Sequence, residues 1–151
     1  MVILTRGWFI IHLLKSAHRE WVLNRNWALD NTPVLLKPWH SLFDASRERV
    51  DMVPIWVRLP GLPLQFWELE HFQMIGNILG SFLEADMSFK ESKHMQVARI
   101  LVNIKIREGL AEDIEHVWGS DTFKQIMDYE NVPFRCRRCH MGILSLIVIF
   151  L

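Results

Sequence analysis

Residues 54–63 have the sequence Pro-Ile-Trp-Val-Arg-Leu-Pro-Gly-Leu-Pro, in which an alternating pattern runs into a proline-rich turn. Aliphatic side chains alternate with Trp56 and Arg58, as in a strand that buries only one face. Proline fixes its own backbone angle and restricts the preceding residue, so residues 60–63 should form a rigid turn. The stretch therefore predicts a half-exposed strand that ends at a fixed turn.

The pattern of an amphipathic helix follows this turn. Apolar residues recur every three to four positions over residues 69–79. Glu68 and Glu70 lie near the start, where the helix dipole favours anions, and Gly80 can end the helix. Such a helix needs a sheet face against which to bury its apolar side.

Further strands are expected after this helix. The first covers residues 82–86, and the second, with the clearest alternation in the chain, covers residues 95–107. One face of the second strand consists of Ala98, Ile100, Val102, Ile104 and Ile106. Its other face carries Arg99, Asn103, Lys105 and Arg107, with Leu101 among them. Residues 114–118 and 122–129 are expected to form a hairpin through Gly119-Ser120.

The first half of the chain has weaker patterns. We expect a strand at residues 7–14 and a short amphipathic helix at residues 17–28, with Ser16 as its cap. A second strand should cover residues 34–37. Residues 41–51 are polar and are expected to be a linker.

Together these patterns predict an α+β fold with helices packed on one face of a mostly antiparallel sheet. The leading arrangement is ferredoxin-like, similar to that of RNA-recognition-motif domains. We expect residues 1–133 to form one α+β domain. Residues 134–142 should be a short cysteine-containing stub, and residues 143–151 an unstructured apolar tail that the fold does not need.

Composition limits the class of protein. The chain has 151 residues, of which 50% are hydrophobic and 23% charged, which suits one ordinary domain rather than a disordered chain. Lys and Arg total 17, as do Asp and Glu, so binding to nucleic acid or to acidic lipid would need a local patch. Seven Trp and nine Phe suit core packing and, equally, stacking on bases.

The cysteines and the apolar segments at the two ends of the sequence indicate the cellular compartment. Cys136 and Cys139 are the only cysteines, and their close spacing favours a thiolate pair in a reducing compartment. Arg6 and His12 interrupt the first apolar run, which makes it a poor signal peptide. The tail is shorter than the roughly 20 residues of a membrane-spanning helix. We therefore expect an intracellular protein, in nucleus or cytoplasm, with no membrane partner.

Patterns of catalytic sites do not occur in the sequence. The seven histidines are scattered, and neither a His-Glu-x-x-His motif nor a glycine-rich phosphate loop is present. No serine stands in a nucleophile-elbow sequence. We expect no enzymatic activity, no catalytic residue and no small-molecule substrate.

Two groups of residues are candidates for nucleic-acid binding. The first is a sheet face on which an aromatic ring is flanked by cations, as in several readers of single-stranded RNA. It consists of Trp56, Arg58, Arg99, Asn103 and Lys105. The competing interpretation, to which we give more weight, is structural: Glu84 and Asp86 on the neighbouring strand would pair with the two arginines.

The second group is the dense basic cluster around the cysteines. Arg135, Arg137 and Arg138 suit phosphate contacts, because each planar guanidinium donates hydrogen bonds in pairs. Cys136 and Cys139 are candidate zinc ligands, but they supply only two of the four that a structural zinc ion needs.

Three pieces of the sequence occur together in a known family. They are Val22-Leu23 with Trp27, Leu35-Leu36 and Trp39; the run Trp56 to Pro63; and Tyr129-Glu130 leading through Pro133 to Cys136-Arg137-Arg138-Cys139. Over about residues 6–142 the chain resembles the plant domain of unknown function 4283, a Gag-like domain of retrotransposon-derived proteins. The resemblance implies a non-enzymatic module that binds single-stranded RNA or DNA.

The chain differs from this family at both ends. Members usually have a further strand and helix before the segment that begins here near Arg6, so we expect the amino-terminal part to be incomplete. They usually continue into a zinc knuckle of the form Cys-x2-Cys-x4-His-x4-Cys, but Leu144 stands at the histidine position. We expect zinc only in the intact family, and foreign sequence after Gly142. A protein assembly domain that self-associates, or a gene fragment with no function of its own, remain the alternatives.

Overall fold

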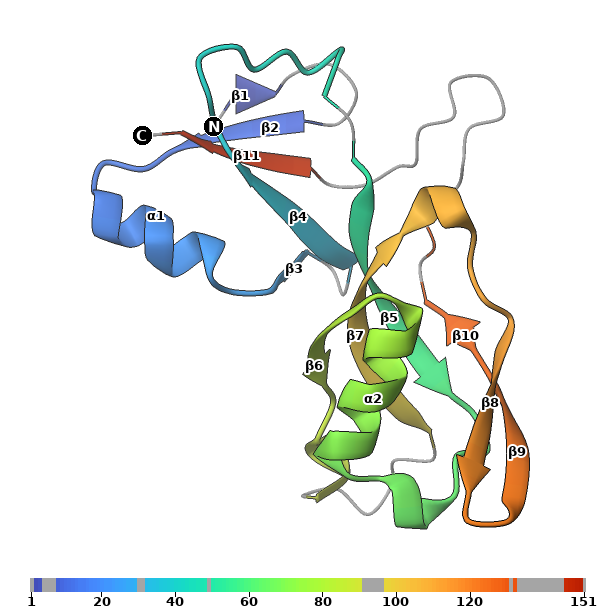
Figure 1. Cartoon of the computed structure of the whole chain (residues 1–151). Coiled ribbons are helices and arrows are strands. Elements are labelled where there is room, and N and C mark those ends of the chain that lie inside the picture. Colours follow the sequence, from blue (N-terminus) through green and yellow to red (C-terminus); the bar gives the residue numbers. More distant parts are fainter. Residues whose placement is uncertain are drawn as a thin grey trace. The chain divides into compact units, whose positions relative to one another are not determined.

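The computed structural model describes residues 2–3, 8–29, 32–48, 50–90, 97–130, 132 and 146–150. It confirms a mixed α+β structure whose strands pair mostly antiparallel. The chain divides into two compact units rather than one domain to residue 133 (Figure 1). Unit 1 comprises Met1–Val50 and Pro133–Leu151, and unit 2 comprises Asp51–Val132. The boundary falls within the predicted linker.

Unit 2 contains a four-stranded antiparallel sheet. Its strands are β5 (Met52–Leu59), β6 (Ser81–Ala85), β7 (Ala98–Lys105) and β10 (Asp128–Tyr129), in the order β10-β5-β7-β6. β5 and β7 pair without interruption from Met52 opposite Lys105 to Leu59 opposite Ala98. The strands predicted at residues 54–59, 82–86 and 95–107 are confirmed within the described residues, which leave out residues 95–96. The last strand ends at Lys105 because the chain turns into a 3-10 helix at Ile106.

Helix α2 (Leu69–Leu79) covers one face of this sheet, as its periodicity predicts (Figure 1). Phe72 and Ile75 are fully buried, and the helix packs on β6 and β7. The approach is close at two glycines: a Cβ on Gly76 would lie 2.8 Å from the Phe82 ring, and one on Gly80 2.3 Å from the Asn103 carbonyl oxygen. Short 3-10 helices complete the unit: η2 (Leu64–Phe66), η3 (Ser88–Lys90) and η4 (Ile106–Glu108).

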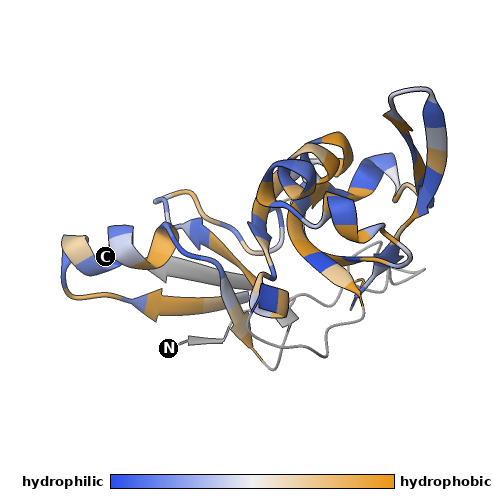
Figure 2. Cartoon of the chain, turned by 90° about the horizontal axis from the view of Figure 1, so that it is seen from below, coloured by the Kyte–Doolittle hydropathy of each residue, from blue (hydrophilic) through white to orange (hydrophobic). Residues whose placement is uncertain are grey.

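The predicted hairpin is present as β8 (Asp113–Trp118) and β9 (Asp121–Ile126), and both of its strands contain hydrophobic and hydrophilic residues (Figure 2). The strand expected over residues 122–129 is two elements, because residues 128–129 leave the hairpin to pair with β5. A ferredoxin-like arrangement is not confirmed. That fold has a second helix before its last strand, whereas unit 2 has this hairpin there.

Unit 1 is built on a five-stranded sheet in the order β1-β2-β11-β4-β3. The strands are β1 (Val2–Ile3), β2 (Trp8–His12), β3 (Trp27–Leu29), β4 (Thr32–Pro38) and β11 (Leu146–Phe150). β11 pairs in parallel with both β2 and β4. The expectation of an unstructured tail is therefore wrong: its β-forming residues satisfy the backbone groups of two strands that would otherwise have open edges.

Helix α1 (Ser16–Leu23) is shorter than the helix predicted over residues 17–28. The predicted cap is wrong: Lys15 occupies the cap position and makes no side-chain capping hydrogen bond, and Ser16 is the first residue of the helix. The helix stops early because residues 27–29 pair with β4, where Trp27 lies opposite Val34. Strand pairing there replaces the helical hydrogen bonds that the sequence pattern favoured.

The core of unit 1 centres on Trp8, which is fully buried. Its partly buried neighbours are Ile10, Leu35, Trp39, Phe43, Ala45 and Val50. The segment expected to be a polar linker thus supplies apolar contacts to this core. Its polar side chains form an ion-pair group in which Glu48 contacts Lys37 and, at 3.0 Å, His40.

Candidate nucleic-acid interface

The sheet face of unit 2 brings the predicted aromatic and basic residues together. Pairing of β5 with β7 places Arg58 directly opposite Arg99, and Trp56 opposite Leu101, so all four lie on one face. The guanidinium carbon of Arg99 lies 4.4 Å from the centre of the Trp56 ring. The sequence therefore predicted this group of neighbours correctly.

Carboxylates occupy the hydrogen-bonding groups of Arg99. Its Nε and Nη2 donate to the two carboxylate oxygens of Glu130, both at 2.9 Å, and its Nη1 donates to Asp86 Oδ2 at 3.0 Å. The Glu130 contact is a bidentate pair, the strongest arrangement that arginine makes with a carboxylate. The expected pairing of Asp86 with Arg99 is confirmed, with Glu130 as a second partner.

The other cations of this face also have acidic partners. Arg58 lies 3.4 Å from Asp128 and 3.9 Å from Glu130, in place of the expected Glu84, because β10 runs beside β5 and carries these acids. Lys105 lies 3.4 Å from Glu108. Two arginines thus share three carboxylates, which favours the structural interpretation of the face over the binding of phosphates.

The pKa values around Arg99 agree with this interpretation. Burial raises the pKa of Asp86, but hydrogen bonds from Ser88 and Arg99 lower it by more, so the pKa lies below its usual range. Burial lowers the pKa of Arg99, while the hydrogen bonds and charges of Glu130 and Asp86 raise it above its usual value. Each partner thus holds the other in its charged form.

A second pair of arginine and tryptophan lies in unit 1, at the end of α1. The guanidinium carbon of Arg25 lies 4.2 Å from the centre of the Trp21 ring. The Trp21 and Trp27 rings meet edge to face, with centres 5.5 Å apart. Trp21 is 50% exposed and Trp27 37%. We call Trp21, Arg25 and Trp27 the unit 1 aromatic cluster.

The sequence interpretation missed this cluster. We expected Trp21 and Trp27 within one amphipathic helix over residues 17–28 and did not consider them for binding. In the structure α1 has no buried residue, and the chain leaves the helix before Trp27. The signal that could have revealed it is the interleaving of Trp21 and Trp27 with Lys15, Arg19 and Arg25, since Glu20 is the only acid between residues 15 and 27.

The hairpin of unit 2 carries a further aromatic group. Phe66 of η2 stacks on Phe123 at 5.3 Å and meets the edge of Trp118 at 5.1 Å, which anchors the hairpin. His116 is buried beside Phe123, and burial, with the nearby His71, lowers the pKa of His116. Val117 and Ile126 lie on the opposite face of the hairpin and are exposed, and Trp118 stays 55% exposed although its ring meets Phe66.

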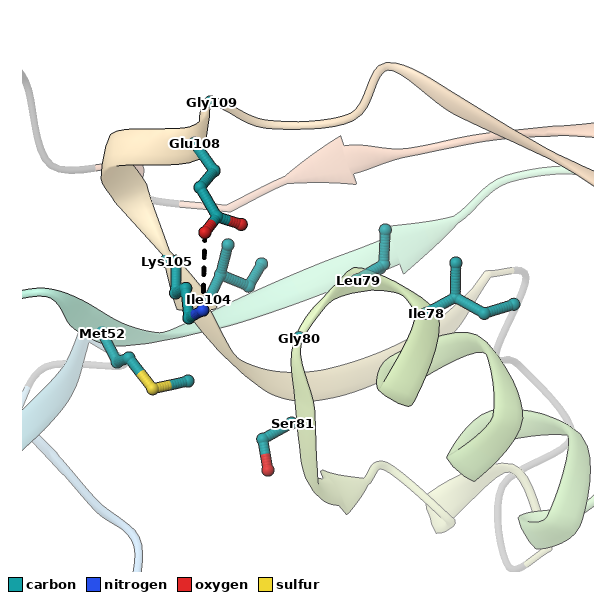
Figure 3. A pocket seen from close by; sticks show the side chains of 9 residues that line it. All are labelled: Met52, Ile78, Leu79, Gly80, Ser81, Ile104, Lys105, Glu108 and Gly109. Atoms are coloured by element: carbon teal, nitrogen blue, oxygen red, sulfur yellow. Dashed lines mark hydrogen bonds and ion pairs between the residues drawn. The ribbon is translucent and has the colours of Figure 1, made fainter.

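A pocket of about 260 Å³ lies between the end of α2 and the end of β7 (Figure 3). Lys105 and Glu108 are the charged residues of its lining, and they form the ion pair drawn there. The rest of the lining is apolar or small. The two charges of the lining cancel, so the pocket has no net charge that would favour an ionic ligand.

The predicted stub lies outside the described residues. This applies to Cys136 and Cys139 and to the basic residues Arg135, Arg137 and Arg138. In the part of the chain that is described, no group of three or more His, Cys, Asp or Glu could hold a metal ion. No helix in that part is long and apolar enough to span a membrane.

Charge is divided unequally between the two units. Unit 2 contains 7 Lys and Arg against 13 Asp and Glu, a net charge of −6. Unit 1 contains the remaining 10 Lys and Arg and 4 Asp and Glu, a net charge of +6. The neutral total of the sequence therefore conceals one basic and one acidic unit.

Comparison with known proteins adds no family to this description. No family model, no curated protein and no solved structure matches the chain. The resemblance to the Gag-like domain therefore stays a prediction from the motifs.

Proposed function

We propose that this chain is a non-enzymatic module that binds single-stranded nucleic acid through unit 1. The observation that carries the proposal is the division of charge, which leaves unit 1 at +6 and unit 2 at −6. Phosphate contacts dominate the affinity for nucleic acid, so the basic unit attracts the ligand and the acidic unit repels it.

The resemblance to the retrotransposon-derived Gag-like domain supports the same function, and a plant mobile element is the origin that we propose. The zinc knuckle of that family does not fit this chain. A structural zinc ion needs four ligands, whereas the sequence contains two cysteines and has Leu144 at the histidine position. The proposal therefore uses the basic residues of the stub and no metal.

The test is the binding of a fluorescently labelled single-stranded RNA to the full chain at increasing salt. Phosphate contacts predict that log Kd rises with log salt, with a slope of about 0.7 per contact. Replacing Arg135, Arg137 and Arg138 with Gln should weaken binding and lower that slope by about 2.

The matched control removes the same three charges from unit 2. It replaces Lys105, Arg107 and Lys124 with Gln, all of which are well exposed. Both variants have the same total charge, so only the position of the charges differs. Binding that is insensitive to salt, or equal losses in both variants, would show that unit 1 is not a phosphate-binding unit.

A second candidate function is protein assembly, favoured by the exposed apolar residues of unit 2. These are Leu64, Leu69, Met74, Ile78, Val117, Trp118, Ile126 and Val132. Apolar patches that stay exposed often mark protein contacts. The salt titration separates the two functions, because apolar self-association does not weaken as salt rises.

A further inference from the structure

We propose that Trp21, Arg25 and Trp27 form a stacking site for a base of single-stranded nucleic acid, with Arg25 free to contact the adjacent phosphate. This inference rests on the proposed function and names the site within unit 1. Base stacking on aromatic side chains, combined with a basic groove, is how proteins bind single strands without reading their sequence.

The first argument is that the aromatic rings are exposed and fixed. The indole nitrogen of Trp27 donates a hydrogen bond to the Val22 carbonyl oxygen at 2.8 Å, which holds the ring at the end of α1. Trp21 meets it edge to face, and Arg25 lies against the Trp21 ring. A platform that is already ordered loses less side-chain entropy when a ligand binds.

The second argument is that the guanidinium of Arg25 is electrostatically available. Among the residues that the structure describes, no carboxylate lies within ion-pair distance of Arg25, whereas Arg99 in unit 2 has two such partners. Lys15 precedes α1, Arg19 lies within it, and Glu20 is the one acid between residues 15 and 27. A phosphate that approaches Trp21 therefore meets a segment with an excess of positive charge.

The third argument separates nucleic acid from a protein partner. Trp118 is 55% exposed, about as much as Trp21, but lies between Asp113, Glu115 and Asp121 in the acidic unit. Exposure alone would make both tryptophans equal candidates for any apolar contact. Charge complementarity selects the unit 1 aromatic cluster for a polyanion and excludes the hairpin.

The experiment compares Trp21→Ala with Trp118→Ala in the full chain, using fluorescence anisotropy of a labelled oligouridylate. Loss of one stacked base should weaken binding about 5- to 150-fold in Trp21→Ala. Trp118→Ala should bind like the unchanged chain. Trp21→Phe should recover most of the affinity, because any flat aromatic ring can stack on a base.

A companion variant, Arg25→Gln, tests the phosphate contact. It should lower the salt slope by about 0.7 and keep the thermal transition, since Arg25 is exposed. If Trp21→Ala fails to fold, Arg25→Gln decides the question, because Arg25 is exposed and its replacement leaves both rings in place.

The outcomes distinguish this inference from the proposed function. RNA binding that is intact in both Trp21→Ala and Arg25→Gln overturns the stacking site and leaves the proposed function standing. Absence of RNA binding by the full chain overturns both. Intact RNA binding with loss of self-association in Trp21→Ala would assign the cluster to a protein contact instead.

Discussion

Unit 1 and unit 2 each place an arginine over a tryptophan, at 4.2 Å for Arg25 on Trp21 and 4.4 Å for Arg99 on Trp56. The surroundings of the two pairs are opposite. Arg99 is partly buried and forms ion pairs with two carboxylates, so its charge stabilises the fold. Arg25 is exposed in a basic segment. The same local geometry therefore stabilises one unit and remains available for binding in the other.

The cores of the two units differ as well. Of the buried hydrophobic residues among the described side chains, Trp8 and Val34 belong to unit 1, and the others belong to unit 2. Each buried aliphatic or aromatic side chain contributes about 1.5–3 kcal/mol. Among the described side chains, unit 1 therefore has fewer buried apolar residues than unit 2, and its sheet also relies on the pairing of β11 with β2 and β4.

Deleting residues 143–151 should have the largest effect, because it should unfold unit 1 and leave unit 2 folded. The deletion removes β11 from between β2 and β4, so the backbone groups of both strands lose their partners and unit 1 should unfold. Hydrogen exchange measured by mass spectrometry should show lost protection in peptides from residues 8–48. Peptides from residues 52–59 and 98–105 should keep theirs. Unchanged exchange in unit 1 would show that the tail is dispensable after all.

One core variant in each unit tests whether the two units unfold separately. Trp8→Ala and Phe72→Ala each remove a fully buried aromatic ring and should each cost about 3–5 kcal/mol. Trp8→Ala should expose the amides of unit 1 alone, and Phe72→Ala those of unit 2 alone, in the same exchange measurement. If either variant exposes both units together, the two do not unfold separately.

The smallest of these effects concerns the ion pairs of unit 2. Arg99→Gln removes the bidentate partner of Glu130 and the arginine partner of Asp86, and should cost about 1–3 kcal/mol in thermal or denaturant unfolding. The matched control Arg58→Gln should cost less than about 1 kcal/mol, because its pair with Asp128 is largely exposed. Equal losses of stability in the two variants would mean that the bidentate contact of Arg99 stabilises the fold no more than the exposed pair of Arg58.

Arg99→Gln should also change how the stability of the protein depends on pH. The pKa of Asp86 is lowered in the folded state, so its contribution to stability is present above the unfolded value of about 3.9 and is lost as the pH falls through the lower, folded value. Acidification below about pH 4 should therefore destabilise the unchanged chain more than Arg99→Gln. An identical loss of stability on acidification in both proteins would show that Arg99 does not lower the pKa of Asp86.

Local patterns were enough to determine most of unit 2. Alternation over residues 54–59 and 98–104 and the periodicity over 69–79 predicted its main strands and helix, because the side-chain spacing of each element matches its backbone repeat. The pairing of Asp86 with Arg99 also followed from neighbouring strands. These features depend on residues close in sequence or on one sheet register.

Only the tertiary structure decided the rest. The tail pairs with strands more than a hundred residues away, and Glu130 reaches Arg99 across 31 positions, so no local period contains either contact. α1 ends early because Trp27 pairs with β4, which a helical pattern cannot reveal. The opposite charges of the two units likewise depend on which distant segments fold together, since the sequence as a whole has a net charge of zero.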